Sequence, residues 1–290
     1  MSTLSLNPLA DAPASDFSTA LRRVLRQPLT LCCALVILLV GAASVLAPWI
    51  APYPYDAIDL QLGPTAPSAA HWFGTDVLGR DLFSRTLHGG LISLAVGLVG
   101  TLVSLIVGVL YGAVAGYKGG RMDELMMRFV DLLYSLPYLF LVIILLVFFS
   151  NSILMLFVAL GLVQWLTMAR IVRGQVLSLR NAEFVQAARL FGTRTTGIIF
   201  KHLLPNMAGP IVVYGTLTVP TVILQEAFLS FLGLGVQPPR ASWGTLISDG
   251  AGVMSMFPWL VFFPAATLAA VLFSLNYLGD ALREVLDPRR

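Results

Sequence analysis

The stretch Gly90–Gly116 reads GLISLAVGLVGTLVSLIVGVLYGAVAG, and it contains no charged side chain. A helix needs about 20 mainly apolar residues to cross the roughly 30 Å hydrocarbon core of a bilayer, so this stretch predicts a membrane-spanning helix. Small residues recur along it at steps of three and four, at Ser93, Gly97, Thr101, Ser104, Gly108 and Gly112. They share one helical face, where small side chains let a neighbouring backbone approach closely. The stripe therefore predicts a buried helix–helix seam, with a cavity lining as the alternative.

The rest of the chain has the same membrane character. Of its 290 residues 57% are hydrophobic and only 11% are charged, whereas soluble domains carry about 25% charged residues. Its two cysteines, Cys32 and Cys33, are adjacent, which predicts neither a disulfide framework nor a metal site. Windows of spanning length lie at 29–50, 90–116, 132–150, 152–171, 208–229 and 257–279. The expected fold class is an all-α polytopic membrane protein with six transmembrane helices, the third and fourth joined by a short turn at Ser150–Ser152.

The basic residues set the orientation, because lysine and arginine near helix ends accumulate on the cytosolic side. With an inner N-terminus, all of the 18 lysines and arginines except Arg80, Arg85 and Arg240 lie inside. Both termini are therefore expected in the cytosol. The expected organisation is a cytosolic tail (1–28), a first transmembrane helix (29–50), an extracytoplasmic segment with a short amphipathic helix (51–89), a core of five transmembrane helices (90–279) and a cytosolic tail (280–290).

One segment assigned to the cytosol, residues 181–206, reads NAEFVQAARLFGTRTTGIIFKHLLPN. Asn181 is a good N-cap, and helical spacing puts Phe184, Ala187, Ala188 and Phe191 on one apolar face. Gly192 is expected to take the left-handed conformation that ends many helices, and a second short helix should follow until Pro205. This two-helix elbow either lies on the inner leaflet or docks a soluble protein.

The elbow resembles the coupling loop of bacterial ABC importer permeases, in which Glu-Ala-Ala and a glycine precede a Leu-Pro pair. Gln186 replaces the usual glutamate, and His202 replaces an isoleucine. The positions that match are Ala187, Ala188, Gly192, Leu204 and Pro205. The resemblance implies that these residues, with Glu183 and Gln186, form the contact with an ATPase subunit.

Three other stretches resemble the dipeptide, oligopeptide and nickel permease family, and its dipeptide C-type subunits in particular. They are HWFGTDVLGRDLFSR (71–85), MRFVDLLYSLP (127–137) and QEAFLSFLGLGVQPPRASWGTLISDG (225–250). The resemblance implies a non-enzymatic permease subunit in a bacterial cytoplasmic (inner) membrane. Its implied partners are a second homologous permease, two cytosolic ABC ATPases and an extracytoplasmic solute-binding protein. ATP and magnesium are expected on the ATPases and no cofactor in this chain, because its sequence has no G-x-x-x-x-G-K-[S/T] phosphate loop.

Charged residues mark two further candidate sites. Asp76 with Arg80, and Asp81 with Arg85, have the i,i+4 spacing of ion pairs on a helix. They predict an outer-surface helix that ends at Gly89–Gly90, with docking of the extracytoplasmic partner as the alternative. Arg128 and Asp131 predict a helix-end ion pair, with a gating contact as the alternative.

Single polar residues complete the sequence expectations. Glu226 falls at the outer end of the fifth span, where partial solvation is favoured over a substrate site. Trp243 suits an anchor at the membrane interface. The histidines His71, His88 and His202 have no metal-ligand spacing, so no metal site is expected.

The substrate is less determined than the class of transporter. A peptide is the favoured substrate, and nickel, glutathione or another small solute stay as alternatives. A channel or secondary transporter is more remote, because such proteins carry ionisable residues within the membrane, and no span has one clearly at its centre. An intramembrane enzyme would need a nucleophile facing a base at depth, a pairing that the spans do not offer.

Overall fold

The computed structural model describes residues 27–148 and 153–286. The predictions for the N-terminal tail and for the turn at Ser150–Ser152 lie outside these residues. The described helices are α2 (Pro28–Val45), α3 (Ala47–Ile50), α4 (Leu82–Lys118), α5 (Gly120–Ser135), α6 (Tyr138–Phe148), α7 (Ile153–Leu179), α8 (Glu183–Leu190), α9 (Thr195–Gly197), the π-helix η1 (Ile198–Leu203), α10 (Leu204–Asn206), α11 (Ala208–Phe231), α12 (Trp243–Ala251) and α13 (Trp259–Leu286).

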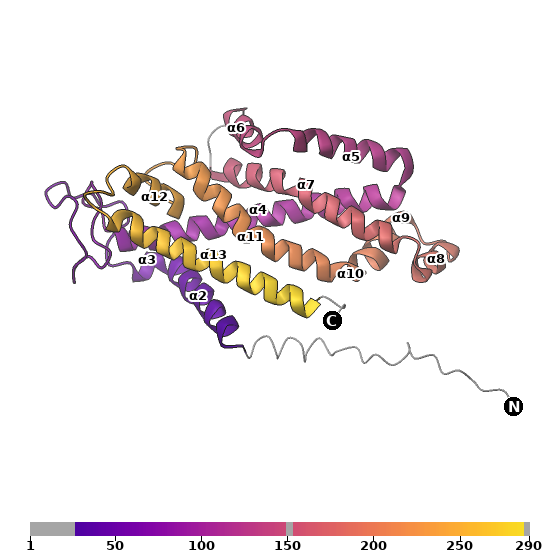
Figure 1. Ribbon diagram of the computed structural model, residues 1–290, viewed down its shortest axis with the longest axis horizontal. Coiled ribbons are helices and arrows are strands. Elements are labelled where there is room, and N and C mark those ends of the chain that lie inside the picture. Colours follow the sequence, from indigo (N-terminus) through magenta and orange to yellow (C-terminus); the bar gives the residue numbers. More distant parts are fainter. Residues whose placement is uncertain (1–26, 149–152, 287–290) are drawn as a thin grey trace.

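Long helices run side by side along the length of the molecule, with α12 at one end and α8 at the other (Figure 1). Five of them, α2, α4, α7, α11 and α13, are long and apolar enough to cross a membrane. They confirm the all-α polytopic fold class and five of the six predicted spans.

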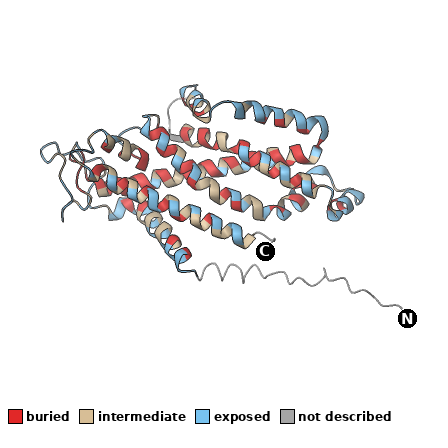
Figure 2. Ribbon diagram, viewed as in Figure 1, coloured by how far each residue is buried: buried red, intermediate tan, exposed pale blue. Residues whose placement is uncertain are grey.

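The predicted third span, 132–150, is wrong as a single straight helix. α5 and α6 meet at an angle of 91°, so they form either one broken span or a re-entrant segment. The break has a local cause, because Leu136 is extended (φ −81°, ψ 134°) and precedes Pro137, whose ring disfavours a helical conformation in the residue before it. α5 then lies alongside α7, with much of its surface exposed (Figure 2).

The seam predicted along α4 is confirmed, since all six residues of the stripe are buried. A Cβ added at Gly108 would lie 2.6 Å from the Cβ of Met168 and 2.8 Å from the carbonyl oxygen of Trp165, both in α7. At Gly112 it would collide with the backbone carbonyl of Ala169. The stripe is therefore a packing seam rather than a cavity lining.

The N-terminal end of α4 differs from the prediction. Residues 75–81 form a turn closed by a bridge between Thr75 and Asp81, so the expected short helix over 75–88 is wrong. Gly79 has a positive φ of 73°, which takes the backbone off a helical path. Helix α4 begins only after Asp81, whose carboxylate accepts a hydrogen bond of 2.7 Å from the Ser84 backbone N–H. It then passes through Gly89–Gly90 without ending.

The predictions for Trp243 and Glu226 are also wrong, because both side chains are fully buried. The Trp243 indole donates to the Thr86 carbonyl at 3.0 Å. The Glu226 carboxylate accepts hydrogen bonds from Ser230 at 2.6 Å and from Ser93 at 3.4 Å. These contacts join α4, α11 and α12 at one end of the molecule.

Candidate functional site

The elbow at residues 181–206 is built around a glycine-capped helix. Gly192 has a φ of 74°, which confirms the predicted left-handed conformation. Its N–H bonds to the Arg189 carbonyl at 3.0 Å, and the Thr193 N–H bonds to the Ala188 carbonyl at 3.0 Å. This pair of bonds is the Schellman motif, which closes the end of α8 and redirects the chain.

The buried face of the elbow packs against the membrane helices. Val185 and Ala188 of α8 are buried in one cluster with Leu203 of η1, Val172 of α7 and Ala113 of α4. On the same side, the Arg189 guanidinium lies 5.0 Å from the centre of the Tyr117 ring, near the end of α4. Because interiors pack closely, a force on α8 is transmitted to α4 and α7.

The face of α8 that is not packed against the membrane helices carries exposed apolar side chains. Leu190 and Phe191 are each 88% exposed, and Phe184 is 37% exposed; with the exposed Ala187 they form what we term the docking patch. The predicted apolar face thus divides, since Ala188 is buried with Val185 while the docking patch is exposed. Exposed apolar patches of this kind mark protein or membrane interaction sites.

The remaining elbow residues have different environments. Glu183 and Gln186 are exposed, and the Gln186 amide donates to the Asn181 carbonyl at 2.8 Å. The N-cap is Ala182 rather than the predicted Asn181. Leu204 is half-buried and Pro205 exposed, and the helical backbone continues one residue beyond Pro205, to Asn206.

Gly192→Val should uncouple the elbow. Among the described residues no atom lies within 4 Å of an added Cβ at this position, so the penalty is conformational, at about 1–2 kcal/mol for a left-handed residue. We expect α9 and η1 to shift relative to α8, and substrate-stimulated ATP hydrolysis and uptake to fall together. Gly192→Asn is the matched control, because asparagine tolerates this conformation. Full uptake and full ATPase retention by the valine variant would contradict a coupling role.

The predicted Arg128–Asp131 pair is wrong. Arg128 pairs instead with Glu124 one turn away on α5, and Asp131 pairs with Arg170 of α7 at 2.7 Å. Arg128 and Asp131 are three residues apart on α5, but their side chains reach different partners. Arg128 contacts Glu124 on the same helix, and Asp131 contacts Arg170 on α7. The Asp131–Arg170 pair joins two helices, as does the two-bond contact between Asp123 and Arg173.

Beside the Asp131–Arg170 pair lies a polar surface that the sequence predictions did not include. Gln164 of α7 donates to Gln225 of α11 at 3.0 Å, and the Tyr134 hydroxyl lies 2.6 Å from that of Thr167. These four side chains line a cavity of about 310 Å³. With Asp131 and Arg170 they form what we term the polar groove. The signal in the sequence was the three-residue spacing of Gln164, Thr167 and Arg170, which puts them on one side of α7.

The outer charged residues form a cluster that is largely buried. Asp76 accepts from the Arg80 Nε at 2.7 Å, so this predicted pair exists, although on a turn rather than a helix. The predicted Asp81–Arg85 pair is wrong, because the Asp81 carboxylate caps α4 and contacts the Nδ1 of His71 at 2.9 Å. Arg85 instead lies 3.7 Å from Asp249 of α12. Docking of an outer partner on Asp76, Arg80, Asp81 and Arg85 stays a prediction.

The fold and these sites define a class of protein: a polytopic helical membrane subunit with a rigid elbow that has an uncovered apolar face. Residues 108–290 match the family described as binding-protein-dependent transport system inner membrane component. Residues 15–67 match the N-terminal TM domain of oligopeptide transport permease C. The chain belongs to the family of binding-protein-dependent transport system inner membrane components, and this confirms the resemblance found in its motifs.

Several relatives align over nearly the whole chain. It is 47% identical to the oligopeptide transport system permease protein OppC of Haemophilus influenzae, over 95% of this chain and 89% of the relative. It is 48% identical to OppC of Escherichia coli K12, over 95% and 92%, and 46% identical to the dipeptide transport system permease protein DppC of Bacillus subtilis, over 93% and 85%.

One solved structure shares the fold. A chain of the inward-facing MetNI methionine ABC transporter superposes with a TM-score of 0.59 at 17% identity, covering 71% of this chain and 96% of that one. At this identity the likeness concerns the fold alone.

Proposed function

We propose that this chain is one of two homologous permease subunits in an ATP-driven peptide importer of a bacterial inner membrane. The observation that carries the proposal is the docking patch, which lies on an elbow packed against α4 and α7. The names of the relatives, oligopeptide and dipeptide permeases, support a peptide substrate over nickel or glutathione. ATP and magnesium would bind to two cytosolic ATPases, and a solute-binding protein would deliver the peptide from outside.

The orientation follows from the distribution of charge. The elbow and both termini lie inside in this proposal, and α12 with residues 51–81 lies outside. The lysines and arginines support it, because all but Arg80, Arg85 and Arg240 are then on the inner side.

The polar groove is the part of this chain that would line the translocation path. Helix α7 has 27 residues, or about 40 Å at 1.5 Å per residue, and Arg170 lies roughly 14 Å before its inner end by the same rise. Its side chain is 43% exposed, and that of Asp131 is 63% exposed. A charge that faces lipid at depth costs about 2.5–3.5 kcal/mol or more, so this face suits contact with water or with the companion permease.

Mechanical coupling follows from the packing of the elbow. An ATPase that holds the docking patch would move α8, and the cluster beneath α8 would carry that motion to α4 and α7. The polar groove lies on α7, so a rigid shift of this helix would change access to the groove. This is alternating access by movement of packed helices about an interface.

Reconstitution of the assembled importer tests this function. We expect uptake of labelled trialanine into vesicles only when ATP is on the elbow side and the solute-binding protein is on the other. Uptake of a nickel complex or glutathione, without uptake of trialanine, would contradict the proposed peptide substrate. Uptake by this chain alone without ATP would indicate a channel or secondary transporter and would overturn the importer assignment.

A further inference from the structure

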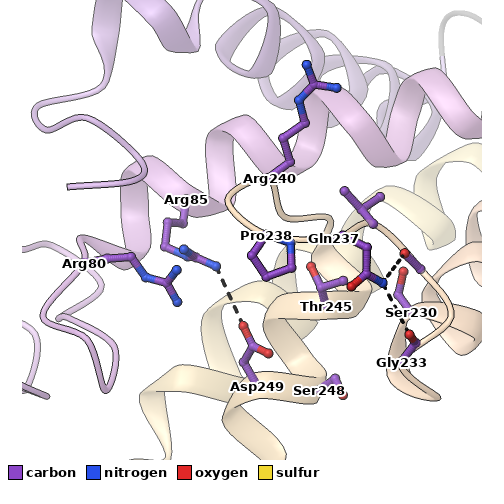
Figure 3. A pocket seen from close by; sticks show the side chains of 12 residues that line it. Arg80, Arg85, Ser230, Gly233, Gln237, Pro238, Arg240, Thr245, Ser248 and Asp249 are labelled. Atoms are coloured by element: carbon purple, nitrogen blue, oxygen red, sulfur yellow. Dashed lines mark hydrogen bonds and ion pairs between the residues drawn. The ribbon is translucent and has the colours of Figure 1, made fainter. Parts of the chain in front are cut away.

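A second polar cavity (Figure 3) lies beside the end of α11 and the helix α12, at the opposite end of the molecule from α8 (Figure 1). Its volume is about 160 Å³. Its lining includes three arginines and one acid, Arg80, Arg85, Arg240 and Asp249, together with Gln237 and Ser248. We term it the outer arginine pocket. Neither the elbow nor the polar groove includes any of these residues.

Arg85 is the unusual residue of this pocket, because its buried guanidinium lacks adequate partners. Only 3% of the residue is exposed, and its Nε and Nη1 have no hydrogen-bond partner. The nearest carboxylates, Asp76 and Asp249, are 3.6 and 3.7 Å away, beyond hydrogen-bond distance. Burying N–H donors without acceptors is costly, so a group that supplied acceptor oxygens here would be bound favourably.

The charges of the pocket favour an anion. The Asp76 carboxylate already pairs with the Nε of Arg80 at 2.7 Å. Asp249 is the one acidic side chain among the lining residues. Figure 3 shows the Arg85 guanidinium pointing toward Asp249, while Arg240 extends away from it. The Asp249 side chain is 59% exposed, so it can turn to solvent and leave the Arg85 guanidinium free for another anion. A carboxylate matches a guanidinium in both charge and paired geometry.

We propose that the outer arginine pocket binds the C-terminal carboxylate of the incoming peptide. This inference rests on the proposed peptide import. Ser230 on the pocket wall lies five residues beyond Gln225 of the polar groove, about 7.5 Å along α11 and about 140° around it. A peptide held at its carboxylate would therefore pass partway around α11 to reach the groove, where the amides of Gln164 and Gln225 provide neutral donors and acceptors for peptide bonds.

A carboxylate could also come from an acidic side chain of the solute-binding protein. The cavity of about 160 Å³ has room for a carboxylate and the atoms next to it from either source. The experiment below includes the binding protein as a separate arm.

The test uses a cysteine at the pocket wall in the assembled permease and ATPase complex, without the binding protein. Ser248→Cys is placed in a chain whose Cys32 and Cys33 are replaced by alanine, and the rate of labelling of this chain by N-ethylmaleimide is measured. Trialanine should slow the labelling about threefold when present at twice its dissociation constant, and trialanine amide should not. Asp249→Asn should increase the protection by trialanine but not that by trialanine amide, because the substitution removes the competing carboxylate. Arg85→Gln should abolish the protection by trialanine.

Each outcome decides the inference. Equal protection by the acid and the amide would overturn carboxylate recognition, and so would an Asp249→Asn variant that leaves the protection by trialanine unchanged. Protection by the peptide-free binding protein but not by trialanine would reassign the pocket to protein docking. If Arg85→Gln does not assemble, the Asp249→Asn comparison decides alone. Normal trialanine uptake without protection refutes only this inference, whereas absent uptake in the reconstituted importer refutes the proposed function.

Discussion

Phe191→Asp should release the ATPases from the purified complex while the permease still inserts and folds. Phe191 is 88% exposed, so the change disturbs no packing within the chain. An aromatic anchor at the centre of an interface typically contributes about 2 kcal/mol or more, which corresponds to a roughly 30-fold loss of affinity, and a buried aspartate adds a desolvation cost. The measurement is the amount of ATPase that co-elutes with the permease pair.

Phe191→Leu is the matched control, because it keeps an apolar side chain at the same position and should retain most of the ATPase. A docking patch that rests on the inner leaflet would give a different pattern. In that case Phe191→Asp would leave ATPase retention unchanged, and the interfacial interpretation of the elbow would replace the docking one.

Gly108→Leu should prevent the chain from reaching its folded, assembled state. The Cβ alone would lie 2.6 Å from Met168 and 2.8 Å from a backbone oxygen of α7, and backbone cannot move aside as the tip of a side chain can. Overpacking of a close-packed core typically costs 1–3 kcal/mol and occasionally more, and we expect about 3 kcal/mol here because α4 and α7 would separate along their seam. The measurement is the yield of monodisperse complex and its thermal unfolding midpoint.

Gly41→Leu is the matched control in α2, since no atom lies within 4 Å of an added Cβ at Gly41. It should assemble normally. Equal behaviour of the two leucine variants would show that the stripe on α4 is not the seam that holds α7.

The parts of the fold that the sequence predicted are those governed by local periodicity. The small-residue stripe of α4 and the left-handed Gly192 each depend on residues within one or two turns, so their pattern is visible in the sequence. Some of the wrong predictions concern residues whose partners are distant in the chain, whereas the break of the third span is local and lies at Leu136 and Pro137. Asp131 pairs with Arg170, 39 positions away.

At the end of the molecule that holds α12, one wrong prediction has a local cause and another a distant partner. The spacing of Asp76, Arg80, Asp81 and Arg85 is helical, but Gly79 has a positive φ that a spacing argument does not contain. Trp243 suited an interface by its chemistry, yet it is buried because it donates to Thr86, 157 positions earlier. Of the candidate sites, the elbow was predictable because its two helices are short and adjacent. The polar groove was not, since Gln164 and Gln225 meet only after α7 and α11 have packed.

Contact between the elbow and an ATPase is the central claim, and directed cross-linking measures it most directly. Leu190 is as exposed as Phe191, so Leu190→Cys can carry a short thiol-reactive photo-cross-linker in a chain whose Cys32 and Cys33 are alanine. Irradiation of the assembled importer should join this chain to an ATPase subunit, and the yield should change when ATP is added. A cysteine at Ala70, which is exposed on the opposite end, should give no such product. Cross-linking of position 190 to lipid alone, with an intact complex, would contradict the coupling role of the elbow.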